Sequence, residues 1–90
     1  MLIDGELTEK VIGVCIAVHK ELGGGFLESV YQKALTIALA QAGLKAAEQV
    51  SLQVKFRGQV VGDFYADILV EERLVLELKA CKALTAEHES

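Results

Sequence analysis

Apolar side chains occupy every second position in two neighbouring stretches of this 90-residue chain, and both stretches use even numbers. Successive side chains of a β-strand point to opposite faces of a sheet, so each stretch predicts a strand with one apolar face. Paired strands share a core face, and a slip of one residue would turn every apolar side chain away from it. The pattern therefore predicts a hairpin in which Val70 pairs with Leu74 across a loop of three residues, 71–73. The apolar positions are Phe64, Ala66, Ile68 and Val70, then Leu74, Leu76, Leu78 and Ala80.

Three charged residues lie on the opposite face of the predicted hairpin. In the predicted register, Asp67 of the first strand lies opposite Glu77 of the second, and Lys79 lies opposite Tyr65. Directly opposed side chains have Cβ atoms roughly 4.5–5.5 Å apart, so the two carboxylates would repel each other. We expect a cation or the neighbouring Lys79 to offset that repulsion.

The first half of the chain predicts two helices that pack as a hairpin. Thr8 is a suitable N-cap for a helix that runs to about Leu22, and three consecutive glycines from Gly23 end it. A second helix covers about 27–42, and Gly43 is its C-terminal stop. Apolar residues recur at three- and four-residue steps in both helices. The expected stripes are Leu7, Val11, Val14, Cys15, Val18 and Leu22 in the first helix, and Leu27, Val30, Tyr31, Ala34, Ile37, Ala38 and Ala42 in the second.

The apolar period changes to two after Gly43. Alternation over residues 50–56 predicts a half-buried strand, and residues 57–59 form a turn signal. Strands over 60–70 and from Leu74 to about Cys81 follow. The predicted fold class is α+β, with a helical hairpin packed on a three-stranded antiparallel meander, in one domain over residues 1–90.

The end of the chain carries a helix start. Thr85 is a suitable N-cap, and Glu87 and Glu89 follow in the first turn, so we expect a third helix to begin there and the domain to be incomplete at its C-terminus. A three-stranded sheet also keeps an open edge. We therefore expect the chain to form a homo-oligomer through that edge.

Composition narrows the class of protein. The chain is 52% hydrophobic and has no proline, so it folds rather than remaining disordered. Its longest apolar run, from Val11 to Val18, is too short for a membrane span of roughly 20 residues, and acidic residues precede it, so we expect a cytoplasmic protein without a membrane segment. The net charge of −4 argues against a large nucleic-acid footprint but allows a small one. Cys15 and Cys81 are expected to be buried free thiols.

The carboxylates of Asp67 and Glu77 suit a hard divalent cation such as Mg²⁺, with Mn²⁺ as a substitute, because these ions take oxygen ligands. A lysine two residues further on the same face, Lys79, can hold or activate a water beside the metal. This assembly suits hydrolysis of a phosphodiester, in which the metal stabilises developing charge and generates the nucleophile.

These residues also match a known pattern. Asp67 followed ten residues later by Glu77, Leu78 and Lys79 resembles the active-site signature of the PD-(D/E)xK nuclease superfamily. Upstream, residues 25–31 fit the pattern G-x-x-E-x-x-Y. The chain resembles the small bacterial GxxExxY family of that superfamily over residues 7–89.

The resemblance implies a partial restriction-endonuclease-like core and a Mg²⁺-dependent nuclease that acts on nucleic acid. It implies that Asp67 and Glu77 are the metal carboxylates and that the carbonyl of Leu78 is a further ligand. Lys79 would be the catalytic lysine, and Glu28 would be an additional catalytic acid. His19 and Tyr31 would lie near the site, without assigned roles.

Structural interpretations remain open beside the catalytic ones. Asp67 and Glu77 are also compatible with a solvated sheet face, and Glu28 with an ordinary acid of a helix first turn. The functional alternative is a non-catalytic interaction module that keeps the nuclease fold and uses its open sheet edge to bind a partner or itself. The remaining polar and aromatic candidates have ordinary structural interpretations: Asp63 and His88 at the surface, Lys55 and Arg57 on a solvated strand, Tyr31 in the core and His19 on a partly buried helix face.

Overall fold

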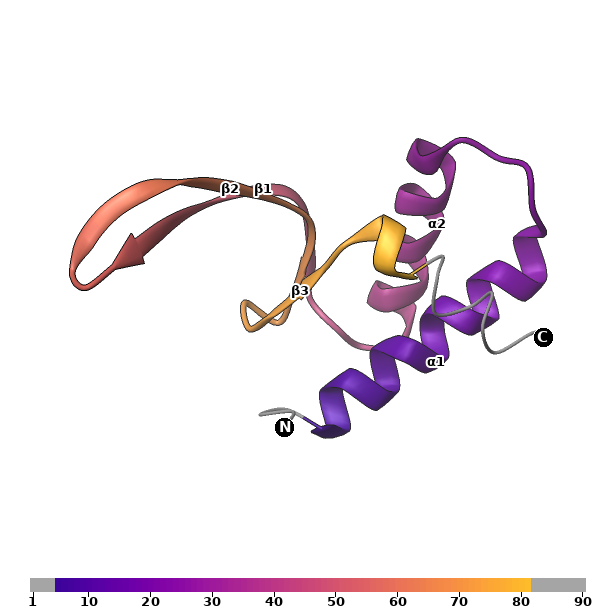
Figure 1. Ribbon diagram of the computed structural model, residues 1–90. Helices are drawn as coiled ribbons and strands as arrows, with labels where there is room; N and C mark the ends of the chain where they lie inside the picture. The colour runs from indigo at the N-terminus through magenta and orange to yellow at the C-terminus, as the bar shows by residue number, and fades with distance from the viewer. Residues whose placement is uncertain (1–4, 82–90) are drawn as a thin grey trace.

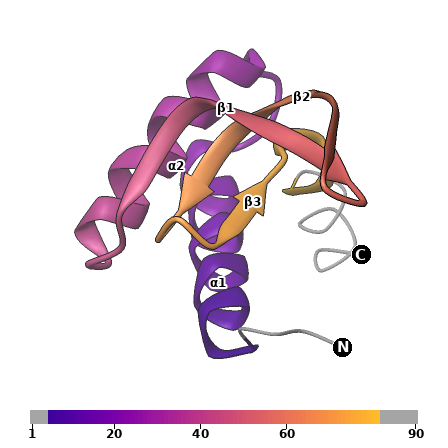
Figure 2. The same ribbon diagram turned by 90° about the vertical axis from the view of Figure 1, so that its left-hand side faces the viewer.

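The computed structural model describes residues 5–81. Two helices, α1 (Gly5–Leu22) and α2 (Glu28–Gln41), are followed by three strands, β1 (Ala46–Phe56), β2 (Gln59–Val70) and β3 (Leu74–Leu76). The strands form one antiparallel sheet in the order β1-β2-β3, and the helices lie on one face of it (Figures 1 and 2). The predicted α+β class is confirmed. The helix expected from Thr85 lies outside the described residues.

The helix α1 buries the stripe that its sequence predicts, and α2 does not. In α1, Leu7, Val11, Cys15 and Val18 are buried, but the helix begins at Gly5, so the prediction of Thr8 as N-cap was wrong. In α2 the buried residues are Tyr31, Leu35 and Leu39, whereas Leu27, Val30 and Ile37 of the predicted stripe are exposed. The observed stripe buries the side chains of Leu35 and Leu39, whereas the predicted stripe contains three alanines. The observed orientation of α2 therefore buries more apolar surface.

The connection between the helices depends on two left-handed glycines. Gly23 has φ 79° and Gly25 has φ 89°, a region that other residues rarely adopt. The hydroxyl of the buried Tyr31 donates a hydrogen bond to the carbonyl of Gly23. Tyr31 therefore fastens the end of α1 to the first turns of α2.

The hairpin of β2 and β3 has the predicted register but a shorter second strand. Val70 pairs with Leu74 and Ile68 with Leu76, across the expected loop of residues 71–73. The prediction that this strand reaches Cys81 was wrong, because it ends at Leu76 and residues 78–81 are helical. The backbone N–H of Cys81 donates to the carbonyl of Glu77 at 3.0 Å, a helical hydrogen bond. Lys79 consequently does not pair with Tyr65.

The hairpin of β1 and β2 is longer than predicted and extends beyond the helices. β1 begins at Ala46 instead of Val50, and β2 begins at Gln59. Arg57 and Gly58 at its turn have φ 51° and 81°, as expected for a two-residue turn whose twist matches the strands. Figure 1 shows its outer half projecting away from α1 and α2. We call residues 52–65 the arm.

The core lies between the helices and the inner half of the sheet. Ala66, Ile68 and Val70 of β2 are fully buried, which confirms their predicted even-numbered core face. Leu78 and Cys81 close the core from the segment after β3. Among the described residues, no helix is long and apolar enough to cross a membrane.

Candidate active site

Asp67 binds the start of the helical segment that follows β3. Its Oδ2 accepts a hydrogen bond from the backbone N–H of Leu78 at 2.9 Å. The first N–H groups of a helix have no partner within the helix, so a carboxylate at this position satisfies one of them. Asp67 therefore has a structural partner, and this contact places the two carboxylates of the predicted site side by side.

Glu77 is the residue between β3 and this helical segment. Its Oε1 is buried and has no hydrogen-bond partner among the described residues. Burial raises the pKa of Glu77 above its usual value, and the adjacent Asp67 raises it further. The ladder between β2 and β3 ends with Ile68 and Leu76, so the predicted strand pairing of Asp67 with Glu77 is absent from it, although the two side chains interact.

All five residues predicted for the site line one open pocket. Glu28 contributes from the first residue of α2, Asp67 from β2, and Glu77, Leu78 and Lys79 from the segment after β3. Lys79 lies in the helical segment, and it still reaches the rim of this pocket. The structure therefore brings the five residues together, while their chemical roles remain predictions.

Three further residues line the pocket and were missed in the sequence: Ser29, Gln32 and Gln49. The Nε2 of Gln49 donates to the Oε1 of Gln32 at 2.9 Å, which connects β1 to α2 at the pocket wall. Gln49 also has a left-handed φ of 49°, unusual for a residue other than glycine. The alternation of polar residues continues back from Ser51 to Gln49, so a strand prediction that began earlier would have found it.

The carboxylate oxygens of Asp67 and Glu77 are suitable ligands for a hard cation. Within residues 5–81, no three Asp, Glu, His or Cys side chains gather as a metal site, so the protein offers the carboxylate pair rather than a full cage. Mg²⁺ retains several of its waters and is commonly bound through one or two carboxylates. The buried, unpartnered oxygen of Glu77 is where such an ion would relieve an unsatisfied acceptor.

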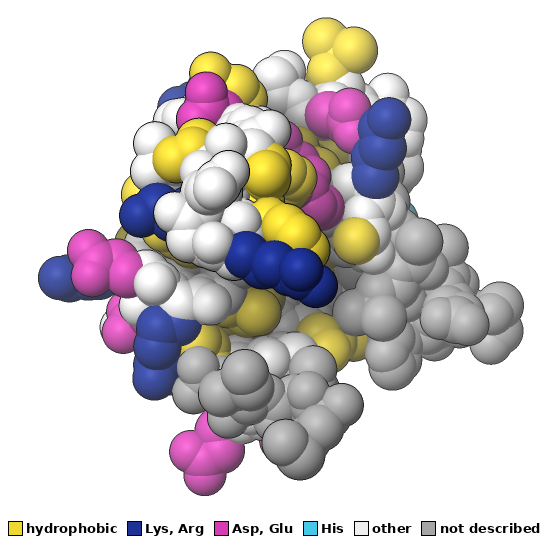
Figure 3. Space-filling view, turned by 60° about the vertical axis from the view of Figure 1, so that its left-hand side comes forward, with side chains coloured by type: hydrophobic (Ala, Val, Ile, Leu, Met, Phe, Trp, Pro, Cys, Tyr) yellow, Lys and Arg dark blue, Asp and Glu magenta, His cyan; other side chains and the backbone are white. Residues whose placement is uncertain are grey.

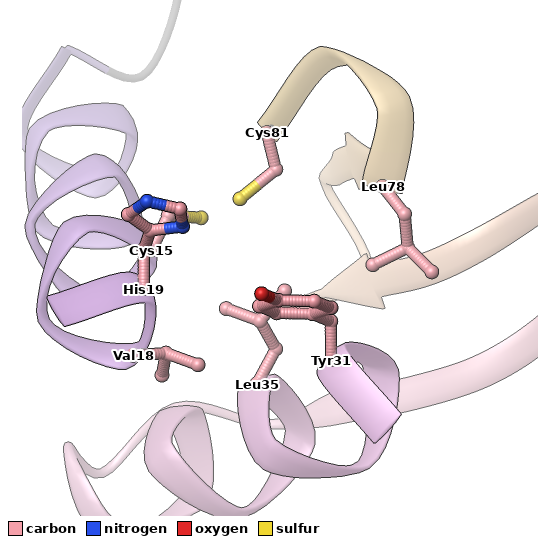
Figure 4. Close-up of a pocket in the computed structure, with 7 residues that line it drawn as sticks. All are labelled: Cys15, Val18, His19, Tyr31, Leu35, Leu78 and Cys81. Carbon is pink, nitrogen blue, oxygen red and sulfur yellow. The ribbon is translucent and has the colours of Figure 1, made fainter. Parts of the chain in front are cut away.

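His19 and Tyr31 line a neighbouring pocket instead, together with Cys15 and Cys81 (Figure 4). The rings of His19 and Tyr31 stack with centroids 6.5 Å apart. Leu78 lines both pockets. His19 and Tyr31 therefore line a different pocket from the carboxylates, and the two pockets share one residue.

The two thiols in that pocket interact with each other. Both are buried and free, as the sequence predicts. A hydrogen bond with Cys81 raises the pKa of Cys15 above its usual value, and burial raises it further. The same bond lowers the pKa of Cys81.

Comparison with known protein families matches residues 5–90 to the PD-(D/E)XK nuclease superfamily. The chain belongs to this superfamily. Searches of curated proteins and of solved structures found no significant match. The match covers both helices, the whole sheet and every residue that lines the carboxylate pocket. In this member of the PD-(D/E)XK nuclease superfamily, Asp67, Glu77 and Lys79 lie within the matched residues.

Proposed function

We propose that this chain is a Mg²⁺-dependent nuclease domain of the GxxExxY family, and that it hydrolyses phosphodiesters of nucleic acid. The observation that carries the proposal is the buried oxygen of Glu77, which lies beside Asp67 without a hydrogen-bond partner among the described residues. Membership of the nuclease superfamily supports the reaction class. The spacing of Gly25, Glu28 and Tyr31 supports the narrower family.

Asp67 and Glu77 would hold the cation. When bound, Mg²⁺ or its substitute Mn²⁺ supplies positive charge for the phosphoryl oxygens and lowers the pKa of a bound water. The hydrogen bond from Leu78 fixes the carboxylate of Asp67, so one ligand is oriented before a metal arrives. The carbonyl of Leu78 is proposed as a further ligand.

Lys79 and Glu28 would act from two different elements that line the pocket. The ammonium of Lys79 can donate hydrogen bonds to an attacking water or to a phosphate oxygen, and its positive charge offsets the two carboxylates. Glu28 lies at the N-terminal end of α2, where the helix dipole favours a negative charge. Its carboxylate is proposed to position water in the pocket as an additional catalytic acid.

A calorimetric Mn²⁺ titration tests the metal site directly. The wild type should show saturable binding, and Asp67→Ala and Glu77→Ala should each abolish it. Asp63→Ala is the matched control, because Asp63 lies on β2 with the same strand parity as Asp67 but does not line the pocket. Absence of binding to the wild type would contradict the proposed function.

The catalytic step needs a second test, with single-stranded and duplex oligonucleotides in Mg²⁺. Lys79→Ala should keep Mn²⁺ binding and lose cleavage by at least about 100-fold, the scale of a positioned proton-transfer group. Cleavage that persists at the wild-type rate in Lys79→Ala would show that Lys79 has no catalytic role.

A second candidate is a non-catalytic interaction module. The observation that favours it is the outer edge of β1, which has no strand partner within residues 5–81 and offers unpaired backbone groups along eleven residues. In this case Asp67→Ala and Glu77→Ala would leave function unchanged, and binding of a partner or of a second copy would depend on the edge of β1.

A further inference from the structure

The arm is a two-stranded ribbon that the other described helices and strands leave largely uncovered. β3 pairs with β2 only from Ile68 to Val70, so no described strand flanks residues 52–65 on either edge. Figure 1 shows the arm projecting from the helices, and the molecule is 43 Å in its longest dimension. An isolated two-stranded hairpin is at best marginally stable in water. The arm therefore gains more than a packed strand would from a partner that covers it.

The two faces of the arm differ in chemistry. One face continues the core face of the sheet, with Leu52 opposite Phe64 and Val54 opposite Gly62. Val54, Phe56 and Phe64 on this face are 42%, 60% and 41% exposed. We call Leu52, Val54, Phe56 and Phe64 the apolar face of the arm, and Figure 3 shows hydrophobic side chains at this end of the molecule with Lys and Arg side chains beside them.

The opposite face of the arm is mixed in polarity. Strand alternation places Lys55, Asp63 and Tyr65 there, together with Val60, which pairs with Lys55. Charged strand residues of the arm are thus confined to one face. Arg57 belongs to the turn, and its guanidinium lies 4.9 Å from the centroid of the Phe56 ring, at the end of the apolar face.

We propose that the apolar face of the arm binds the same face of a second copy of this chain, which forms a two-fold symmetric dimer. A two-fold interface brings each patch against itself, and this face meets its copy without burying any strand charge. Arg57 would lie at the rim, where its charge stays in water. A nucleic acid would instead meet an apolar surface with a single cation at its end, and such a partner requires more basic contacts.

The exposed apolar area of the arm supplies part of the surface that a dimer buries. Phe56 and Phe64 together expose about one aromatic side chain, roughly 200 Å², and the aliphatic residues raise the exposed apolar area to on the order of 300 Å² per copy. A stable interface removes about 800 Å² per partner, and little more than half of that area is apolar. The polar rim and backbone of the arm would supply the remainder.

Sedimentation and light scattering over a range of concentrations test the proposal. The wild type should be a dimer that dissociates on dilution, and the double variant Phe56→Ser/Phe64→Ser should weaken the dimer at least about tenfold. The matched control is Val60→Ser/Tyr65→Ser, which removes side chains that are 54% and 64% exposed from the opposite face. This control should change the dissociation constant less than about twofold.

Circular dichroism and the Mn²⁺ titration keep the result interpretable. Both variants should retain wild-type helix content and the metal binding of the wild type, because the arm lies away from the carboxylate pocket. A single-site variant, Val54→Ser, serves if the double variant fails to fold. A monomeric wild type would overturn the proposal, as would a dimer that survives loss of the apolar face or one that the control disrupts.

Discussion

The carboxylate of Asp67 and the backbone N–H of Leu78 are joined by a hydrogen bond of 2.9 Å between β2 and the segment after β3. This bond takes the N–H of Leu78 out of the strand ladder at the point where the chain turns helical. It also places Glu77, the preceding residue, beside Asp67. The local structure of the candidate site and the interruption of β3 thus have the same cause.

Two substitutions of Asp67 should have opposite effects on the metal-free protein. Asp67→Asn keeps an acceptor for Leu78 and removes the charge beside Glu77, so its melting temperature should rise. Asp67→Ala leaves the N–H of Leu78 without its partner, which should lower the free energy of unfolding by about 1–3 kcal/mol. Thermal and urea unfolding in the presence of EDTA would measure both changes. Equal destabilisation by the two variants would show that the charge repulsion is already compensated.

The raised pKa of Glu77 makes its effect on stability dependent on pH. A carboxyl whose pKa is higher in the folded protein contributes stability at pH values below its pKa in the unfolded chain. That contribution is lost as the pH rises through its pKa in the folded protein. Glu77→Gln should therefore raise the melting temperature at pH 7 without metal, and the gain should shrink as pH falls towards 4.5.

The matched control for that pH series is Glu48→Gln. Hydrogen bonds from Gln32 and Lys33 lower the pKa of Glu48, and the Nζ of Lys33 lies 3.0 Å from its Oε1. Glu48 therefore contributes stability above its unfolded pKa and loses it as pH falls. Its substitution should lower the melting temperature at pH 7, the opposite sign to Glu77→Gln. A melting temperature that changes in the same direction in both variants would contradict the opposite pKa shifts of Glu77 and Glu48.

Tyr31→Phe tests whether this residue of the G-x-x-E-x-x-Y pattern is structural. Loss of the hydroxyl that donates to Gly23 should reduce the free energy of unfolding by about 1 kcal/mol, and Mn²⁺ affinity should not change. Tyr65→Phe, at an exposed position of the arm, should leave both quantities unchanged. Unchanged stability with reduced metal affinity or cleavage would instead show that Tyr31 takes part in metal binding or catalysis.

The thiol pair predicts selective alkylation. The interaction between the thiols lowers the pKa of Cys81 and raises that of Cys15, so iodoacetamide should label Cys81 before Cys15 in the folded protein, as peptide mass spectrometry would show. Cys15→Ala removes this interaction, so labelling of Cys81 should shift to higher pH. Faster labelling of Cys15 than of Cys81 would contradict the prediction.

The sequence determined the two helices, the loop of residues 71–73 and the pairing of Val70 with Leu74, because apolar periodicity and turn residues act locally. It also identified the five candidate residues. Periodicity could not show where β3 ends, because Leu78 suits either a strand or a helix when the segment is short. The hydrogen bond that Asp67 accepts from the backbone N–H of Leu78, eleven residues further along the chain, selects the helix.

Tertiary packing alone decided the remaining features. Burial of Leu35 and Leu39 set the rotation of α2, since the contacting sheet favours the larger side chains. The pocket unites α2, β1, β2 and the segment after β3, and no local pattern records distances between elements so far apart in the chain. The exposure of the arm was likewise decided by the tertiary structure. Strand alternation shows which residues share a face, and only the position of the helices shows which part of that face remains uncovered.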